Sequence, residues 1–194
     1  MKSQKAILVL EDGFILEGSS FGYQGEAIGE VVFNTSLSGY QEILTDPSYK
    51  GQIVVMTCPE IGNVGVNSED VESEKMFLEG FICRNYNPSP SNFRSEEPLH
   101  SYLQKSRIPG IDEIDTRALT RHLRDRGSKM GILSTKDFDK KRLLKKVRGA
   151  PGMVGCDLVK EVTCQKPYRW TEPLWQLKQP LTLLLPQLTQ QHWQ

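Results

Sequence analysis

The sequence predicts an α+β protein in a layered β/β/α arrangement, with a mixed sheet, a few helices and an irregular C-terminal tail. Short β-branched runs gather in the first half of the chain, and helical periodicity dominates the second half. A doubly wound fold would instead alternate strands with helices along the chain. Hydrophobic residues make up 38% and charged residues 25% of the chain, which is an ordinary globular composition with enough apolar side chains for a core.

The first half of the chain predicts strands. Residues 5–10 and 14–17 flank Asp12 and Gly13, a favoured tight-turn pair because glycine accepts a positive φ, so we expect a β-hairpin there. Residues 29–34 form a β-branched run and predict a strand. Residues 52–58 contain consecutive apolar residues, which predict a strand buried on both faces. A fourth strand, or half of a second hairpin, is expected at residues 77–84.

The second half predicts helices around one further strand. The spacing of apolar residues at 99–103 fits a short helix. Residues 115–126 predict the clearest helix, because Asp115 can cap its start and a glycine follows its end. Residues 129–134 predict a strand, and residues 137–148 predict a basic helix that stops before a Gly-Ala-Pro sequence.

The overall composition argues against several classes of function. Lys+Arg and Asp+Glu balance at 24 each, so no global field attracts nucleic acid or an anionic membrane. The four cysteines and three histidines are scattered without metal-ligand spacing, and we predict no metal site. Unpatterned cysteine is typical of a reducing compartment. The apolar run near the N-terminus is too short for a signal sequence and no stretch reaches membrane-spanning length, so we expect a cytoplasmic protein.

Two stretches suggest alternative functions. Cys58 is a conceivable nucleophile of a stand-alone hydrolase, but a thiolate needs a positioned base, and a buried strand cysteine is the favoured interpretation. The stretch from Lys136 to Arg148 holds seven Lys/Arg and two Asp, which makes it the one candidate for binding a nucleic acid or an acidic partner. Its single aromatic residue, Phe138, and the lack of a recognised motif favour a solvated helix face instead.

A row of arginines and a proline turn are further candidate sites. Arg117, Arg121 and Arg124 fall on one side of their predicted helix, where guanidinium groups could bind carboxylates or phosphates or pair with nearby acids. The sequence Asp-Pro-Ser-Tyr at residues 46–49 predicts a type I turn with Ser48 at an exposed corner, together with the tyrosine that follows it. Polar loops between buried strands commonly carry binding residues.

Five segments resemble the small subunit of glutamine-dependent carbamoyl phosphate synthase. They keep an unbroken order, and the resemblance extends over about residues 5–170. The segments are residues 29–49 (GEVVFNTSLSGYQEILTDPSY), 61–65 (IGNVG), 91–94 (SNFR), 114–127 (IDTRALTRHLRDRG) and 155–163 (GCDLVKEVT). Matches of this length over several segments are far more specific than a single short motif.

The resemblance implies a subunit of a ligase that makes carbamoyl phosphate for arginine and pyrimidine synthesis. In that family the N-terminal domain is a layered β/β/α domain of the swivelling type, and a class I amidotransferase domain with a Cys-His-Glu triad follows it. The ammonia released from glutamine passes to a large synthetase subunit, where ATP and a divalent metal are expected. We therefore expect the large subunit as partner, no cofactor on this chain, and neither nucleic acid nor membrane as partner.

The sequence departs from the family pattern where the amidotransferase should stand. The family nucleophile lies in a G-x-C-x-G elbow beside an oxyanion hole, and none of the four cysteines has that setting, so we predict no catalytic residue. Residues 1–165 correspond to the N-terminal domain. Residues 166–194 read as a linker or an aberrant tail with the amidotransferase domain missing, as in a truncated or frame-shifted chain. The resemblance implies that Ser48 corresponds to a family serine that binds glutamine. Ser48 would do so only beside an amidotransferase domain.

Overall fold

The computed structural model describes residues 4–153, 155–164, 166–167 and 169. One compact unit extends to Thr163. The predicted boundary between residues 1–165 and 166–194 stays a prediction, because most of the second segment lies outside the described residues.

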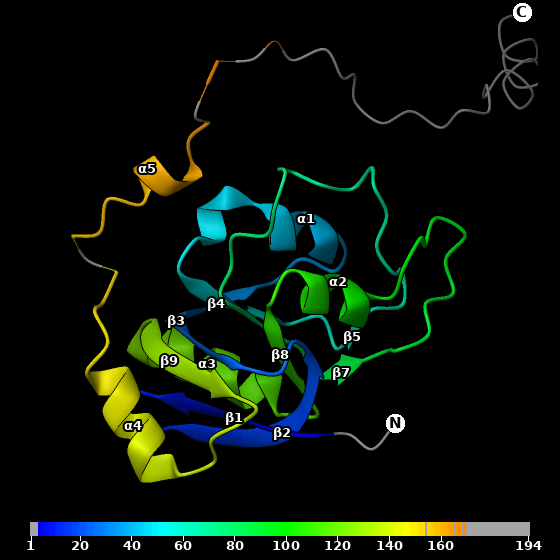
Figure 1. The fold of residues 1–194 in the computed structure, drawn as a ribbon. Helices are drawn as coiled ribbons and strands as arrows, with labels where there is room; N and C mark the ends of the chain where they lie inside the picture. Colours follow the sequence, from blue (N-terminus) through cyan, green and yellow to red (C-terminus); the bar gives the residue numbers. More distant parts are fainter. Residues whose placement is uncertain (1–3, 154, 165, 168, 170–194) are drawn as a thin grey trace, which may run out of the picture. The chain divides into compact units, whose positions relative to one another are not determined.

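Seven strands form one closed barrel (Figure 1). Four neighbouring strands, β3, β4, β6 and β8, pair in parallel, whereas β2 and β9 pair antiparallel with the strands on either side of them. Around the barrel the strands are β1 (Gln4–Leu10), β2 (Ile15–Gly22), β8 (Pro109–Asp112), β6 (Gly80–Ile82), β4 (Gln52–Met56), β3 (Glu26–Asn34) and β9 (Lys129–Ser134).

Alternate side chains of the strands fill the barrel. One cluster of buried residues takes side chains from β1, β3, β4, β6, β8 and β9, as expected where successive residues point to opposite faces. Leu119 and Leu123 of helix α3 (Thr116–Arg126) belong to the same cluster, together with Ile114 just before the helix. Helix α3 therefore packs against the interior of the barrel and is held there by burial of its apolar face.

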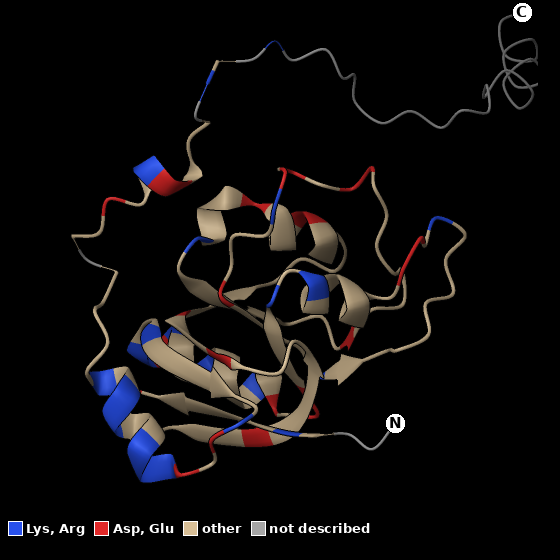
Figure 2. Ribbon diagram, viewed as in Figure 1, with Lys and Arg blue, Asp and Glu red and all other residues tan. Residues whose placement is uncertain are grey.

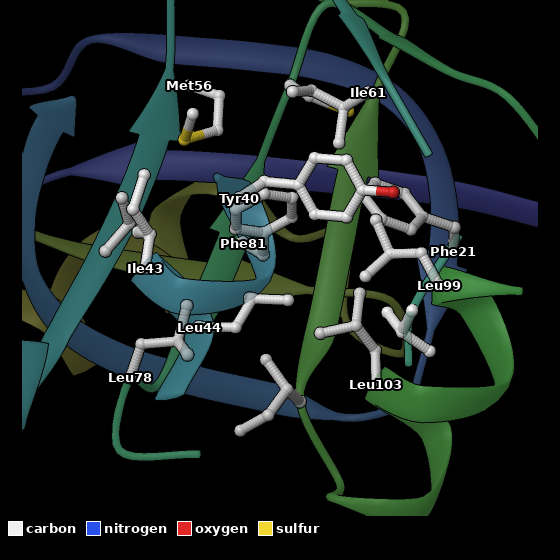
Figure 3. Packing of buried hydrophobic residues seen from close by; sticks show 14 residues of the cluster. Phe21, Tyr40, Ile43, Leu44, Met56, Ile61, Leu78, Phe81, Leu99 and Leu103 are labelled. Atoms are coloured by element: carbon white, nitrogen blue, oxygen red, sulfur yellow. The ribbon is translucent and has the colours of Figure 1, made fainter. Parts of the chain in front are cut away.

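The outer face of the barrel is covered in two places. Helices α1 (Tyr40–Thr45) and α2 (Leu99–Lys105) pack with the outward side chains of β2, β4 and β6 in a second buried cluster, shown in Figure 3. Helix α4 (Lys140–Arg148) covers the outward side chains of β1 and β9 in a third. The remaining elements are short: η1 (Pro47–Tyr49), β5 (Glu60–Ile61), β7 (Asn85–Tyr86) and α5 (Val159–Val162).

Most local predictions are confirmed. The hairpin at Asp12 and Gly13 forms, the strand at residues 129–134 has the predicted bounds, and the Asp115 carboxylate caps α3 by accepting a 2.9 Å hydrogen bond from the Ala118 N–H. The mixed sheet with a few helices is also confirmed. Helix α4 begins later than predicted, because Asp139 rather than Asp137 accepts the hydrogen bonds of its first turn.

The fold differs from the sequence-based predictions in three respects. The sheet closes into a barrel, which the sequence analysis did not state. The strand within residues 77–84 is β6, which pairs in parallel with β4 and β8, so the alternative of a second hairpin is wrong. Strand β8 and helix α1 had no predicted counterpart; β8 is only Pro109–Asp112, and the Gly39 that precedes α1 makes no side-chain cap.

Candidate functional site

The carboxyl ends of the parallel strands meet at one rim of the barrel. Because β3, β4, β6 and β8 run in the same direction side by side, the segments that follow them lie along the same edge. Thr57 follows β4, Arg84 follows β6, and α3 begins shortly after β8. Polar side chains from three distant parts of the sequence are thus brought together.

A groove of about 530 Å³ lies at this rim, between α3 and the segments after β4 and β6. Its lining is made of arginine and threonine side chains and one proline: Thr57, Pro59, Arg84, Thr116, Arg117, Thr120, Arg121 and Arg124. The predicted arginine row of α3 is therefore brought together with a fourth arginine and with hydroxyl groups.

Helix α3 is held in place by contacts on the side of its axis that faces away from the arginine row. The His122 Nε2 lies 2.6 Å from a carboxylate oxygen of Asp12 in the β1–β2 turn, and the Phe14 ring stacks on the imidazole with a centroid distance of 4.4 Å. With Leu119 and Leu123 buried, the helical repeat leaves Arg117, Arg121 and Arg124 exposed. Arginines in the last turn also suit the negative end of the helix dipole.

Ser48 lies at an exposed corner, as predicted. The Asp46 side chain accepts a 2.8 Å hydrogen bond from the Ser48 N–H and so fixes the start of η1. Tyr49 differs from the prediction: it is half-buried against the cluster under α1 and α2, and its hydroxyl accepts a 2.9 Å hydrogen bond from Asn34. Tyr49 therefore anchors the turn to the end of β3, and only the Ser48 side chain is presented to solvent.

The cysteines have no catalytic environment in the described part of the chain. Cys58 lies two residues beyond β4 and is half-buried, so the prediction of a buried strand cysteine is wrong for this residue. Its thiol donates to the carbonyl groups of Leu37 and Glu60, at 3.5 and 3.7 Å. Cys83 is fully buried, and burial raises the pKa of its thiol well above the ordinary value.

Among the described residues, no histidine nitrogen forms a hydrogen bond with a cysteine sulfur, and no group of acidic, histidine and cysteine side chains could hold a metal ion. His100 instead accepts a 3.0 Å hydrogen bond from the Gly22 N–H through Nδ1. A thiol without a base or an oxyanion hole cannot cleave an amide at a useful rate.

We accordingly predict that the purified 194-residue chain releases no ammonia from glutamine above a protein-free blank. Cys58→Ala should give the same background, because within the described residues the Cys58 thiol forms hydrogen bonds only to carbonyl groups. A coupled assay for ammonia measures both proteins. Release that disappears in Cys58→Ala would contradict the prediction and restore the hydrolase alternative.

Helix α4 concentrates Lys and Arg residues (Figure 2), and three of them form ion pairs with acidic side chains. Lys146 lies 2.8 Å from Glu26, Arg142 pairs with Asp137, and Lys140 pairs with Glu17. The hydrogen bond from Arg142 lowers the pKa of the Asp137 carboxyl well below its usual range. These contacts pair three of the seven basic residues from Lys136 to Arg148, and Lys141 and Lys145 are exposed, as expected for a solvated helix face.

Four residues of the groove were not predicted from the sequence: Thr57, Arg84, Thr116 and Thr120. Arg84 and Thr57 carry no local signal, since only the parallel pairing of β4 with β6 brings them beside α3. The threonines lie within the quoted segment 114–127, and their spacing of four residues places them on one side of the helix with the arginines.

Asp112, at the end of β8, is a buried carboxylate that the sequence analysis also missed. Burial, and secondarily the neighbouring charge of Glu113, raises its pKa to about 6 despite a 3.1 Å hydrogen bond from the Tyr86 N–H. It does not line the groove, and its effect is on stability.

In the described residues, no helix is both long and apolar enough to cross a bilayer. A solved structure of a peptidase M28 precursor from Shewanella amazonensis SB2B resembles the chain with a TM-score of 0.36 and 9% identity, covering 68% of this chain and 34% of that one. A likeness this low says nothing about fold or function.

Comparison with protein families gives a much stronger match. The model of the carbamoyl-phosphate synthase small chain, CPSase domain, matches residues 8–133. The chain is 58% identical over 175 residues to the carbamoyl phosphate synthase small chain of Syntrophotalea carbinolica, covering 90% of this chain and 46% of that protein. It is 54% identical to the same protein of a Nostoc species, over 87% of this chain and 43% of that one.

A third relative, the carbamoyl phosphate synthase small chain of Nitratidesulfovibrio vulgaris, is 52% identical over 86% of this chain and 44% of its own length. The chain thus spans less than half the length of these relatives. The resemblance noted from the five sequence segments is confirmed, and the chain belongs to the family of carbamoyl-phosphate synthase small chains.

Proposed function

We propose that this chain supplies the part of a carbamoyl phosphate synthase small chain that docks on the large synthetase chain. The family match at 58% identity over 90% of the chain carries the proposal. The Arg- and Thr-lined groove supports it, because among the described residues the rim offers a set of polar side chains without a catalytic constellation. We also propose that this chain has the layered β/β/α architecture of the swivelling type that is expected for the family.

In this proposal the chemistry takes place on other domains. Glutamine would be hydrolysed by an amidotransferase domain, and ATP with a divalent metal would be used on the large chain to make carbamoyl phosphate for arginine and pyrimidine synthesis. The proposed compartment is the cytoplasm. The nucleic-acid and Cys58-hydrolase alternatives gain no support from the comparisons, because the three relatives described above are each named carbamoyl phosphate synthase small chain.

Ser48 is the residue of this chain that we propose to contact glutamine held by a neighbouring amidotransferase domain. Its hydroxyl is exposed and can donate one hydrogen bond. The corner that carries it is fixed by the Asp46 side chain and by the anchored Tyr49. A rigid support of this kind holds a ligand-binding hydroxyl in place.

The proposal predicts that the purified chain co-elutes with a large synthetase chain of the same family in size-exclusion chromatography at about 10 µM, because stable interfaces of standard size give dissociation constants in or below this range. A full-length small chain is the positive control. Ser48→Ala should leave docking unchanged, and in a full-length small chain it should raise the KM for glutamine several-fold, by about the worth of one hydrogen bond. Separate elution of the two chains, where the full-length control forms a complex, would contradict the proposal.

A further inference from the structure

The groove at the rim gathers arginine side chains that have no acidic partner within the described residues. Among the described residues, the guanidinium groups of Arg84, Arg117 and Arg121 form neither a hydrogen bond nor an ion pair, and no acidic side chain lines the groove. Arg124 pairs through Nε with the exposed carboxylate of Asp125 at 2.8 Å. Four guanidinium groups gathered in one groove repel one another unless an anion lies between them.

A hydroxyl group in the same groove also lacks a partner. The Thr120 Oγ1 is buried and makes no hydrogen bond within the described part of the chain. Buried hydroxyl groups in folded proteins are normally hydrogen-bonded, so an isolated one requires an explanation. Thr120 lies between Arg117 and Arg121 along α3 and lines the groove with them. An acceptor that enters the groove therefore comes beside the arginines and beside the residue that carries the unsatisfied hydroxyl.

The residues that line the groove favour carboxylates of a polypeptide over nucleic acid. Guanidinium groups bind carboxylates and phosphates alike through two parallel hydrogen bonds, so the other lining residues decide between the two. Proteins that bind single-stranded nucleic acid place aromatic side chains beside their basic residues, and none of the residues lining the groove is aromatic. The four-residue step from Arg117 to Arg121 rises about 6 Å along the helix, close to the ~6.6 Å between alternate residues of an extended segment.

We infer that this groove is the contact site for an extended acidic segment of the partner chain, bound through Arg84, Arg117 and Arg121 with the Thr120 hydroxyl as an added donor. The inference rests on the proposed docking function and deepens it, since it assigns the surface and the chemistry of the partner. Alternate Asp or Glu side chains of that segment pair with successive arginines of α3.

The deciding experiment measures the affinity of the intact chain for the large synthetase chain by fluorescence anisotropy. The double variant Arg117→Glu/Arg121→Glu should bind at least about tenfold more weakly, because like charges then face the acidic segment. The matched control is Lys141→Glu/Lys145→Glu, which reverses two exposed and unpaired lysines of the other basic helix. The control should retain its affinity within about twofold, as expected for scattered surface charges.

Thr120→Val tests the site without a change of charge. Valine has the shape of threonine, and the lost hydroxyl has no partner in the free chain, so the variant should keep the thermal stability of the parent. Its affinity for the large chain should fall by about two- to tenfold, which is the worth of one hydrogen bond. This variant also answers the objection that charge reversal disturbs the fold.

Two competitors show whether the groove binds the carboxylates of a polypeptide or a free anion. A hexaglutamate peptide should displace the large chain, whereas inorganic phosphate at the same total charge should not. Equal displacement by phosphate would overturn the inference in favour of a site for free anions, and so would arginine-dependent binding of a single-stranded oligonucleotide. If the parent binds the large chain and both the Arg and Thr120 variants bind equally well, the inference alone fails. If the parent itself does not bind, the proposed function fails with it.

Discussion

Phe81→Ala is expected to lower the free energy of unfolding by about 3–5 kcal/mol, the range found for buried aromatic residues replaced by alanine. Phe81 is fully buried on β6 and is among the largest of the completely buried side chains. Its ring meets the edge of the Phe21 ring at a centroid distance of 6.4 Å, and helices α1 and α2 pack over it (Figure 3). Alanine would leave a cavity between the barrel and helices α1 and α2, where the close packing of the cluster allows only partial collapse.

Urea unfolding followed by far-ultraviolet circular dichroism measures this change in the free energy of unfolding. Phe93→Ala is the control, because the Phe93 side chain is 89% exposed and its loss should change stability by less than about 0.5 kcal/mol. A loss below about 1 kcal/mol for Phe81→Ala would show that the cluster under α1 and α2 is not the packed core described above. Because Arg84 lies two residues beyond the end of β6 and keeps its side chain, the same variant should weaken docking only as far as it depopulates the folded state.

Asp112→Asn is expected to stabilise the protein at neutral pH and to have little effect near pH 4. Burial raises the pKa of this carboxyl from 3.8 to about 6, so between these values the folded chain holds a proton that the unfolded chain has released. The stability of the parent therefore falls as the pH rises through this window. Above it the carboxylate costs up to about 3 kcal/mol, the free energy that corresponds to the pKa difference.

Asparagine removes the charge and can keep the hydrogen bond from the Tyr86 N–H through its amide oxygen. Urea unfolding of parent and variant at pH 4, 5, 6, 7 and 8 should show a stability difference that grows with pH, by at most about 3 kcal/mol. Asp125→Asn is the control. The hydrogen bond from Arg124 lowers the pKa of the exposed Asp125 carboxyl, so its removal should give no gain at high pH. A pH-independent difference for Asp112→Asn would contradict the assigned pKa.

Both residues lie on the strands that build the rim of the groove. Phe81 is on β6 and Asp112 ends β8, and the segments after these strands carry Arg84 and lead into α3. The Glu113 N–H donates a 2.8 Å hydrogen bond to the Arg84 carbonyl, which joins the two segments directly. The position of the arginines therefore depends on the pairing of short strands whose stability comes from packing on both faces of the barrel.

Local sequence signals determined the first hairpin, the start of α3, the family and the exposure of Ser48. The Asp12-Gly13 turn specified the first hairpin, since a tight turn needs a residue that accepts positive φ, and Gly13 has a φ of 91°. Asp115 specified the start of α3 through its side-chain hydrogen bond. The family followed from five sequence segments, and the exposure of Ser48 followed from the proline turn that carries it.

Contacts between residues far apart in the chain decided the rest. Closure of the barrel depends on the pairing of β1 with β9 and of β2 with β8, and Ile7 is paired with Ser134 across the sequence. No local pattern encodes such a pairing, because strand register is selected by burial of whole faces. The groove exists for the same reason: the sequence alone revealed the arginine row of α3, whereas parallel pairing of β4, β6 and β8 placed Thr57 and Arg84 opposite it.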